Sequence, residues 1–162
     1  MTKEFTPEAA YRYATGRCAR AELCRADLRP KLLARGLAPD APDALLDRLE
    51  RERYIDERRY AAAFVHDRMT YNRWGRLKVQ QALRMKGISD EAVRDALSSV
   101  GTEAYAGQLA ALLAAKRRTV RAASAYELRT KLLRFAASRG FELSLAADAV
   151  DRLVRDEEGD GF

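Results

Sequence analysis

The stretch Leu83-Arg84-Met85-Lys86-Gly87-Ile88 has the form of a helix end, in which a basic residue and a glycine are followed by an apolar residue. Glycine is common directly after a helix because it readily adopts the left-handed backbone that closes the last turn. The same ending appears twice more, as Ala34-Arg35-Gly36-Leu37 and Ser138-Arg139-Gly140-Phe141. Three such endings predict a repeat of about 50 residues that contains one helix of this kind in each copy.

Apolar residues recur at intervals of three and four along the whole chain, which is the spacing that places them on one face of a helix. Helix starts are indicated by Thr6-Pro7, Asp56, Ser124-Ala125-Tyr126-Glu127 and Ser144. We expect the fifth helix in chain order to begin at Asn72 or Arg73, which would place Gly75 inside this helix. No stretch shows the sustained alternation that is typical of a strand.

The sequence therefore predicts an all-α protein of about nine helices, arranged as three tandem three-helix repeats in an elongated curved array. We expect the repeats to occupy residues 1–53, 54–100 and 101–162. The clearest internal match places residues 27–33 over residues 127–133, where an acidic residue, Leu and Arg are followed by Lys, Leu and Leu. We expect the acidic end of the chain, from Asp156 to Phe162, to be frayed.

The positive charge of the chain is concentrated in three bands. Residues 17–35 contain six Lys or Arg and two Asp or Glu, residues 68–86 contain six and none, and residues 116–139 contain eight and one. The chain has a formal net charge of +6 and a pI of about 9.5. A repeated basic helix favours an anionic partner, either nucleic acid or an acidic protein surface.

Several classes of protein are disfavoured by the composition. No apolar run approaches the roughly 20 residues that cross a bilayer, and the first residues lack the apolar stretch of a signal peptide, so we expect a cytoplasmic protein. Cys18, Cys24 and His66 do not form a convincing zinc site, and we expect both thiols to be reduced. Because no phosphate-binding loop or nucleophile motif is present, we expect neither catalysis nor a cofactor.

The middle of the chain resembles a known family. Tyr54-Ile55-Asp56-Glu57-Arg58-Arg59-Tyr60-Ala61, then Asn72, Gly75-Arg76-Leu77-Lys78-Val79 and residues 83–88, are similar to the RecX family of recombination regulators. The resemblance covers residues 7–155. Cys24 stands where the family usually has a Ser cap, and Pro30 interrupts the matching helix.

This resemblance implies a function. RecX proteins are helical arrays of three-helix repeats that bind the RecA recombinase filament on single-stranded DNA and restrain its ATPase, strand exchange and coprotease activities. The chain is therefore expected to be a monomeric negative regulator of RecA that modulates DNA repair, with weak binding to duplex DNA also conceivable. Two other classes stay open, namely a helical-repeat protein that binds DNA without a recombinase and a passive scaffold.

The basic bands supply the candidate contacts with DNA or filament. Lys78, Arg84 and Lys86 flank the apolar Val79 and Leu83, so we expect them to face solvent. In each case the alternative is a solvated surface or, at the end of a helix, a cation that favours the helix dipole. The fourteen candidates are Arg29, Lys31, Arg35, Arg73, Arg76, Lys78, Arg84, Lys86, Lys116, Arg117, Arg118, Arg129, Lys131 and Arg134.

Two further motifs have structural interpretations beside the functional ones. We expect Asp56 to cap a helix and Ile55 and Tyr60 to be buried, with contact between Arg58 or Arg59 and a partner as the alternative. Gly75 costs about 1 kcal/mol inside a helix relative to Ala, so close helix packing or a close approach of a partner must require it.

Overall fold

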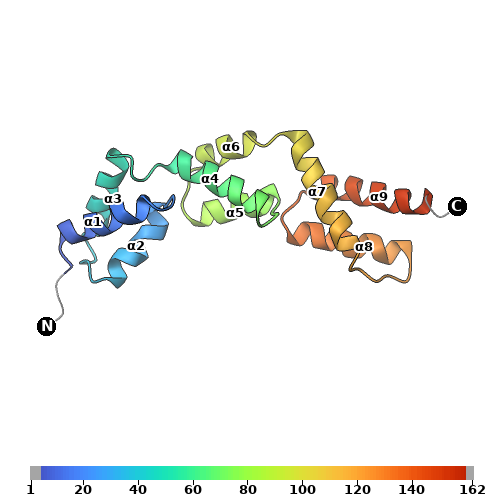
Figure 1. Cartoon of the computed structure of the whole chain (residues 1–162), viewed down its shortest axis with the longest axis horizontal. Coiled ribbons are helices and arrows are strands. Elements are labelled where there is room, and N and C mark those ends of the chain that lie inside the picture. The colour runs from blue at the N-terminus through green and yellow to red at the C-terminus, as the bar shows by residue number, and fades with distance from the viewer. Residues whose placement is uncertain (1–4, 160–162) are drawn as a thin grey trace. The chain divides into compact units, whose positions relative to one another are not determined.

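The computed structural model describes residues 5–159, and these residues contain nine α-helices and no strand (Figure 1), which confirms the all-α prediction. None of the helices in this range has the length and apolar character that a membrane-spanning segment requires. The helices are α1 (Pro7–Cys18), α2 (Arg25–Ala34), α3 (Pro42–Arg51), α4 (Glu57–Thr70), α5 (Arg76–Met85), α6 (Asp90–Ser98), α7 (Thr102–Arg117), α8 (Ala125–Ser138) and α9 (Leu143–Gly159).

The chain divides into two compact units. Unit 1 consists of residues 1–63 together with 83–95, and unit 2 consists of residues 64–82 together with 96–162. All three boundaries fall inside helices, because α4, α5 and α6 each contribute residues to both units. The division of the sequence into repeats at residues 1–53, 54–100 and 101–162 thus stays a prediction.

Unit 1 has its core where α1, α2 and α3 pack on one another. The side chains that fill this core come from the apolar faces that the sequence pattern indicated, and they are almost completely shielded from solvent. They are Ala10, Ala14, Leu28, Leu32, Leu37, Leu46, Leu49 and Ile55.

Unit 2 has a second core among α7, α8 and α9, which pack on one another. Tyr105 is its largest fully buried side chain, with 1% of its surface exposed, and its ring stacks on that of Phe141 at a centroid distance of 5.2 Å. The other buried side chains of the three helices are Leu109, Leu112, Leu113, Leu128, Leu132, Ala136, Ala146, Val150 and Val154.

The three predicted glycine helix ends are present and share one geometry. Gly36, Gly87 and Gly140 have φ of 100°, 76° and 93°, in the left-handed region that favours glycine. After each glycine, the backbone N–H of Leu37, Ile88 or Phe141 donates to the carbonyl five residues earlier, at 3.1 to 3.2 Å. The apolar side chain of that residue is buried in each case. This is the Schellman arrangement, and it explains why an apolar residue follows each glycine.

Gly75 belongs to a close contact between α5 and α8, which we call the α5–α8 joint. The backbone N–H of Gly75 donates to the carbonyl of Arg139 at 2.7 Å, and that of Leu77 donates to the carbonyl of Gly140 at 2.9 Å. A Cβ atom at residue 75 would lie 2.5 Å from the backbone nitrogen of Phe141. Close packing is therefore the reason for the glycine, and the first N–H groups of α5 are satisfied by the last carbonyls of α8.

A polar cluster fastens the same joint. Arg76 forms an ion pair with Glu142 at 2.6 Å, and its backbone N–H donates to the hydroxyl of Tyr105 at 3.0 Å. That hydroxyl donates to Glu142 at 2.6 Å. Burial and the bond to Glu142 raise the pKa of Tyr105 to about 12, so the hydroxyl keeps its proton and remains a donor.

Three details differ from the sequence predictions. The helix expected from Asn72 or Arg73 begins at Arg76, because Arg73 has φ of 56° and Gly75 is held by the joint, so Gly75 lies before the helix. Helix α9 begins one residue before Ser144, since the N–H of Ala146 donates to the carbonyl of Glu142. The end that we expected to fray is helical up to Gly159, and residues 160–162 lie outside the described range.

Substitution of Gly75 by Ala is expected to lower the free energy of unfolding by about 2 kcal/mol, because the added methyl group would force the two backbones of the α5–α8 joint apart. Urea denaturation followed by circular dichroism measures this change.

Gly107 offers the matched control. It lies in the middle of α7 and is exposed, and nothing comes within 4 Å of an added Cβ atom. Gly107→Ala is expected to raise the free energy of unfolding by up to about 1 kcal/mol, because Ala has the higher helix propensity. If the two variants had the same stability, the close contact at Gly75 would not exist.

Candidate nucleic-acid interface

Half of the fourteen candidate basic residues form ion pairs with carboxylates of the chain itself. The partners come from neighbouring helices or from the next turn, so these side chains are already partly neutralised. The pairs are Arg29 with Asp43, Arg76 with Glu142, Arg84 with Asp90, Lys86 with Asp27, Arg117 with Glu157, Arg129 with Asp151, and Lys131 with Glu127.

Two of these pairs are part of the packing. The expectation from the sequence that Lys86 faces solvent is wrong. Lys86 is half-buried and lies 2.5 Å from Asp27, whose side chain is 17% exposed. Burial disfavours the charge on Asp27, but the bonds from Lys86 and from the backbone N–H of Cys24 hold its pKa below the ordinary value. Arg76 is similarly engaged by Glu142. Removing either cation would leave a half-buried carboxylate without its counter-charge.

Seven candidates form no ion pair within residues 5–159, and three of these lie over aromatic rings. Arg35 lies 4.3 Å from the ring centroid of Tyr13, Lys78 lies 4.7 Å from Trp74, and Lys116 lies 4.9 Å from Phe135. An aromatic face orients a cation without cancelling its charge, so these side chains remain able to attract an anion. The other four candidates of this group are Lys31, Arg73, Arg118 and Arg134.

The structure brings three of the candidates together around one hollow of about 500 Å³ in unit 2, which we call the α7–α8 hollow. It lies where the end of α7, the loop after it and α8 meet. Its lining contains four cations, and none of the described residues that line it is Asp or Glu. The lining residues are Lys116, Thr119, Val120, Arg121, Lys131, Arg134 and Phe135.

The loop that forms one wall of this hollow is held at several points. Lys131 donates to the carbonyl of Arg121 at 2.6 Å, and Arg117 donates to the carbonyl of Val120 at 3.2 Å. Ser124 caps α8 by accepting a bond from the N–H of Glu127, as the sequence predicted. The backbone of the loop is therefore held in place before any ligand arrives, which would reduce the entropic cost of binding.

Arg121 is the lining residue that sequence reasoning did not single out. It lies in the basic band of residues 116–139 but was not among the fourteen candidates. Its place beside α8 depends on the bond from Lys131 to its carbonyl, which no sequence spacing indicates. Three candidates from the band 116–139 are not part of the lining: Arg117, which pairs with Glu157, Arg129, which pairs with Asp151, and Arg118.

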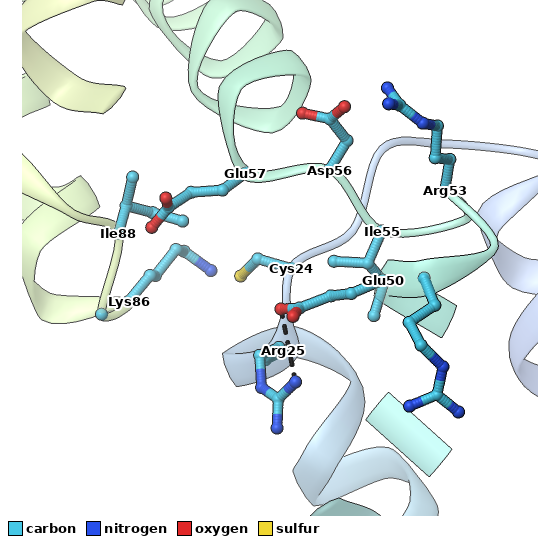
Figure 2. A pocket seen from close by; sticks show the side chains of 11 residues that line it. Cys24, Arg25, Glu50, Arg53, Ile55, Asp56, Glu57, Lys86 and Ile88 are labelled. Atoms are coloured by element: carbon cyan, nitrogen blue, oxygen red, sulfur yellow. Dashed lines mark ion pairs between the residues drawn. The ribbon is translucent and has the colours of Figure 1, made fainter. Parts of the chain in front are cut away.

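A second hollow, of about 460 Å³, lies in unit 1 and has a different character (Figure 2). Its lining mixes cations, carboxylates and apolar side chains, and it includes Cys24, Glu50, Ile55, Glu57 and Lys86. The carboxylates are engaged by the chain itself: Glu50 pairs with Arg25 at 3.3 Å, for example. This lining lacks the single sign of charge that makes the α7–α8 hollow the candidate anion site.

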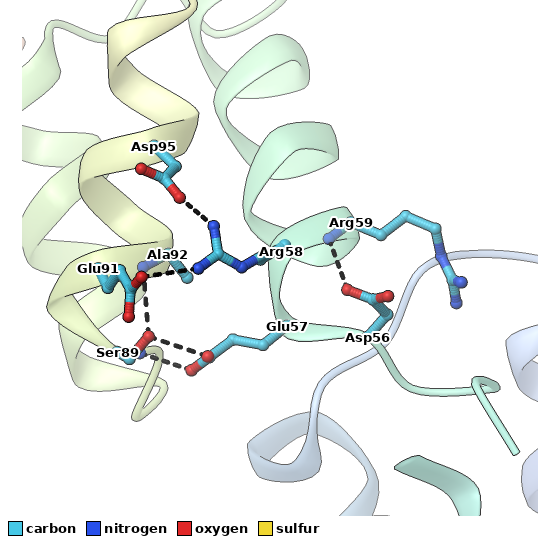
Figure 3. Close-up of polar contacts among 8 residues, drawn as sticks. All are labelled: Asp56, Glu57, Arg58, Arg59, Ser89, Glu91, Ala92 and Asp95. Atoms are coloured by element: carbon cyan, nitrogen blue, oxygen red, sulfur yellow. Dashed lines mark hydrogen bonds and ion pairs between the residues drawn. The ribbon is translucent and has the colours of Figure 1, made fainter. Parts of the chain in front are cut away.

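The motif at residues 54–61 is structural (Figure 3). Asp56 accepts a bond from the backbone N–H of Arg59 at 3.0 Å, which confirms the predicted cap, and Ile55 and Tyr60 are 3% and 5% exposed. Arg58 pairs with Glu91 and Asp95 on α6, and Arg59 pairs with Glu22 at 2.5 Å. Both arginines are thus engaged by carboxylates of unit 1.

Glu57 completes this arrangement. Its two carboxylate oxygens accept bonds from the backbone N–H and the hydroxyl of Ser89, at 2.5 and 2.9 Å. Figure 3 shows these contacts running from the start of α4 to the start of α6. The part of the sequence that carried the family resemblance therefore encodes packing contacts.

Comparison with known proteins gives the family. Residues 56–97 match the second three-helix domain of RecX. The chain is 37% identical over 153 residues to a regulatory protein RecX of Thermus thermophilus, covering 94% of this chain and 96% of that one. It is 35% identical over 132 residues to the regulatory protein RecX of Chromohalobacter salexigens, covering 82% and 84% of the two chains.

Solved structures show the same fold. The crystal structure of RecX from Lactobacillus salivarius is similar with a TM-score of 0.75 and 19% identity, over 91% of this chain and 96% of that one. A second crystal structure of a regulatory protein RecX has a TM-score of 0.80 and 23% identity, over 93% and 73%. Together with the sequence identities, the match to the RecX domain establishes that this chain belongs to the RecX family of regulatory proteins.

Proposed function

We propose that this chain binds the RecA recombinase filament on single-stranded DNA and inhibits its ATPase, strand exchange and coprotease activities, and thereby modulates DNA repair. Membership of a family of regulatory proteins supports the regulatory role. The observation that carries the DNA-binding part of the proposal is the α7–α8 hollow, whose lining contains four cations and, among the described residues, no Asp or Glu.

The chemistry of this hollow suits the phosphates of a nucleic acid. Each Lys or Arg that neutralises a phosphate releases a condensed counterion, and this release drives binding whatever the base sequence. Arg121 and Arg134 form no ion pair within residues 5–159, so an incoming phosphate need not displace a carboxylate from them. Phe135, whose ring Lys116 and Arg139 approach, supplies an apolar wall.

We also propose how the protein works as a whole. It acts by binding as a monomer in the cytoplasm, without a cofactor and without catalysis of its own. The remaining unpaired candidates, such as Lys31 and Arg35 in unit 1, would add contacts with DNA or with acidic surface of the recombinase.

The alternative function is that of a helical-repeat protein that binds DNA without a recombinase. The α7–α8 hollow favours it equally, because a phosphate site does not depend on what else the DNA carries. The two functions differ in their dependence on the recombinase, and this difference can be measured.

Titration of this protein into RecA on single-stranded DNA is expected to lower the rate of ATP hydrolysis. A regulator of the filament acts at concentrations well below those that coat bare DNA, and the protein alone is expected to hydrolyse no ATP. A coupled ATPase assay, with the coating of naked DNA measured in parallel by fluorescence anisotropy, gives both concentrations.

Unchanged ATP turnover at stoichiometric excess over RecA would remove the regulatory proposal. If the protein nevertheless bound the naked strand under these conditions, the alternative of a plain DNA-binding protein would replace it.

The triple variant Lys116→Glu, Arg121→Glu, Arg134→Glu is expected to weaken binding to single-stranded DNA and to flatten its salt dependence. Each lost phosphate contact removes about 0.7 from the slope of log K against log salt concentration, so three contacts remove about 2. Anisotropy titrations at several salt concentrations measure the slope. Lys131 is left in place because it fastens the loop.

The control has the same change of charge elsewhere. Arg12, Arg20 and Arg94 are exposed and form no ion pair within residues 5–159. Reversal of these three to Glu changes the net charge equally but leaves the α7–α8 hollow intact. Equal losses of slope in the two triple variants would mean that binding follows net charge alone, and the hollow would not be the site.

A further inference from the structure

The α5–α8 joint has a counterpart in unit 1, which we call the α2–α5 joint. At each joint the residue before one helix faces the glycine that ends another. Cys24, before α2, corresponds to Gly75, before α5, and Gly87 corresponds to Gly140. The neighbours correspond as well, because the buried Ile88 and Phe141 directly follow the two glycines.

The α5–α8 joint is closed. Two backbone hydrogen bonds cross it. A Cβ atom on Gly75 would overlap the backbone of Gly140, and a Cβ atom on Gly140 would overlap Lys78. Arg76, Tyr105 and Glu142 then form a linked polar cluster beside the glycines. Backbone bonds of this kind tolerate little change in distance or angle, so the joint is stiff.

The α2–α5 joint is open. A Cβ atom at Gly87 would meet nothing within 4 Å, in contrast to Gly140. The space between Cys24 and Gly87 belongs to the hollow of about 460 Å³, and Figure 2 shows the side chains of Cys24 and Lys86 directed toward it. Because Cys24 has a side chain where its counterpart is a glycine, the two backbones cannot approach as they do at Gly75.

The contacts across the open joint are made by side chains. Within the described residues, no backbone hydrogen bond joins α2 or Cys24 to residues 83–95. Lys86 reaches Asp27 at 2.5 Å across this joint. Beside it, Arg59 on α4 reaches Glu22 at 2.5 Å, and the buried Tyr60 on α4 contacts Cys24 and Asp27. The side chains of Arg59 and Glu22 are 45% and 29% exposed, so salt screens this pair; those of Lys86 and Asp27 are 35% and 17% exposed, so salt screens that pair less. Long side chains can also keep an ion pair while the backbones move.

We propose that the α2–α5 joint is a compliant hinge held by ion pairs, whereas the α5–α8 joint is rigid. The first three helices can thus change their position relative to the end of α5 and to α6 within unit 1. The Lys86–Asp27 pair sets the resting position, and Cys24 keeps the joint from closing. This inference does not depend on the proposed binding partner. Its consequence is that the first three helices can adapt to a partner surface that the rest of the chain already contacts.

Spin-label distance measurements test the proposal with one pair of labels across each joint. Ala34 on α2 and Arg94 on α6 are exposed and report on the α2–α5 joint. Gln81 on α5 and Ala137 on α8 are exposed and report on the α5–α8 joint. Each pair is replaced by Cys in the full chain, with Cys18→Ser and Cys24→Ser to remove the native thiols, and circular dichroism checks that each variant is folded.

The distance distribution across the α2–α5 joint is expected to be at least twice as wide as that across the α5–α8 joint. Raising the salt concentration to about 1 M is expected to widen the first distribution further and to leave the second unchanged. The proposal is overturned if both distributions are equally narrow at low salt, or if salt affects neither.

A second variant separates the ion pair from general loosening. Lys86→Gln removes the cation and keeps much of the side chain, so it is expected to widen the α2–α5 distribution at low salt and to reduce its further widening on added salt, because only the Arg59–Glu22 pair then remains. The matched change Arg84→Gln removes an exposed pair with Asp90 that does not cross the joint, and it is expected to have no effect. Equal effects of the two variants would contradict the assigned role of Lys86.

Discussion

The left-handed backbone at Gly36, Gly87 and Gly140 is the constraint on which the rest of the structure depends. Any other residue would incur a cost of roughly 1 to 2 kcal/mol in this conformation, so each glycine defines where a helix stops. The turn that follows directs Leu37, Ile88 or Phe141 inward, where each is buried. One local conformation thus ends a helix and also places an apolar side chain in a core. At Gly140 it additionally exposes the carbonyl that the N–H of Leu77 needs.

The charges are arranged around these fixed points in two ways. Some cations serve the packing, as Arg76 does with Glu142, and their partners are as poorly exposed as they are. Others stand at the surface with no carboxylate beside them, as Arg121 and Arg134 do around the α7–α8 hollow. The basic bands of the sequence do not distinguish paired from unpaired cations, because both are Lys or Arg at the same helical spacing. A cation is paired only where the fold brings a carboxylate near it.

The sequence was informative where the signal is local. Helix ends, the caps at Thr6, Asp56 and Ser124 and the apolar faces follow from residues within one or two turns of each other, and these predictions agree with the structure. The start of α5 was misplaced because its backbone is bound by Arg139 and Gly140, more than 60 residues away along the chain. The same distance in sequence hid the pairing of Arg76 with Glu142, and the reason for Gly75 became visible only with its neighbour in place.

The ion pairs differ in solvent exposure, and this decides how readily a polyanion can compete for their cations. An exposed pair such as Arg84 with Asp90, whose side chains are 55% and 70% exposed, contributes roughly 0 to 1 kcal/mol, so a phosphate can compete for its cation. The pair of Arg76 with Glu142 is 30% and 27% exposed and shares Tyr105, so its separation would leave several polar groups unpaired. Cations are thus available to a ligand in a definite order. The unpaired cations come first, the cations of exposed ion pairs come next, and Arg76 at the α5–α8 joint comes last. Because the unpaired cations around the α7–α8 hollow come first in that order, binding at this proposed site would leave the contacts that hold the fold intact.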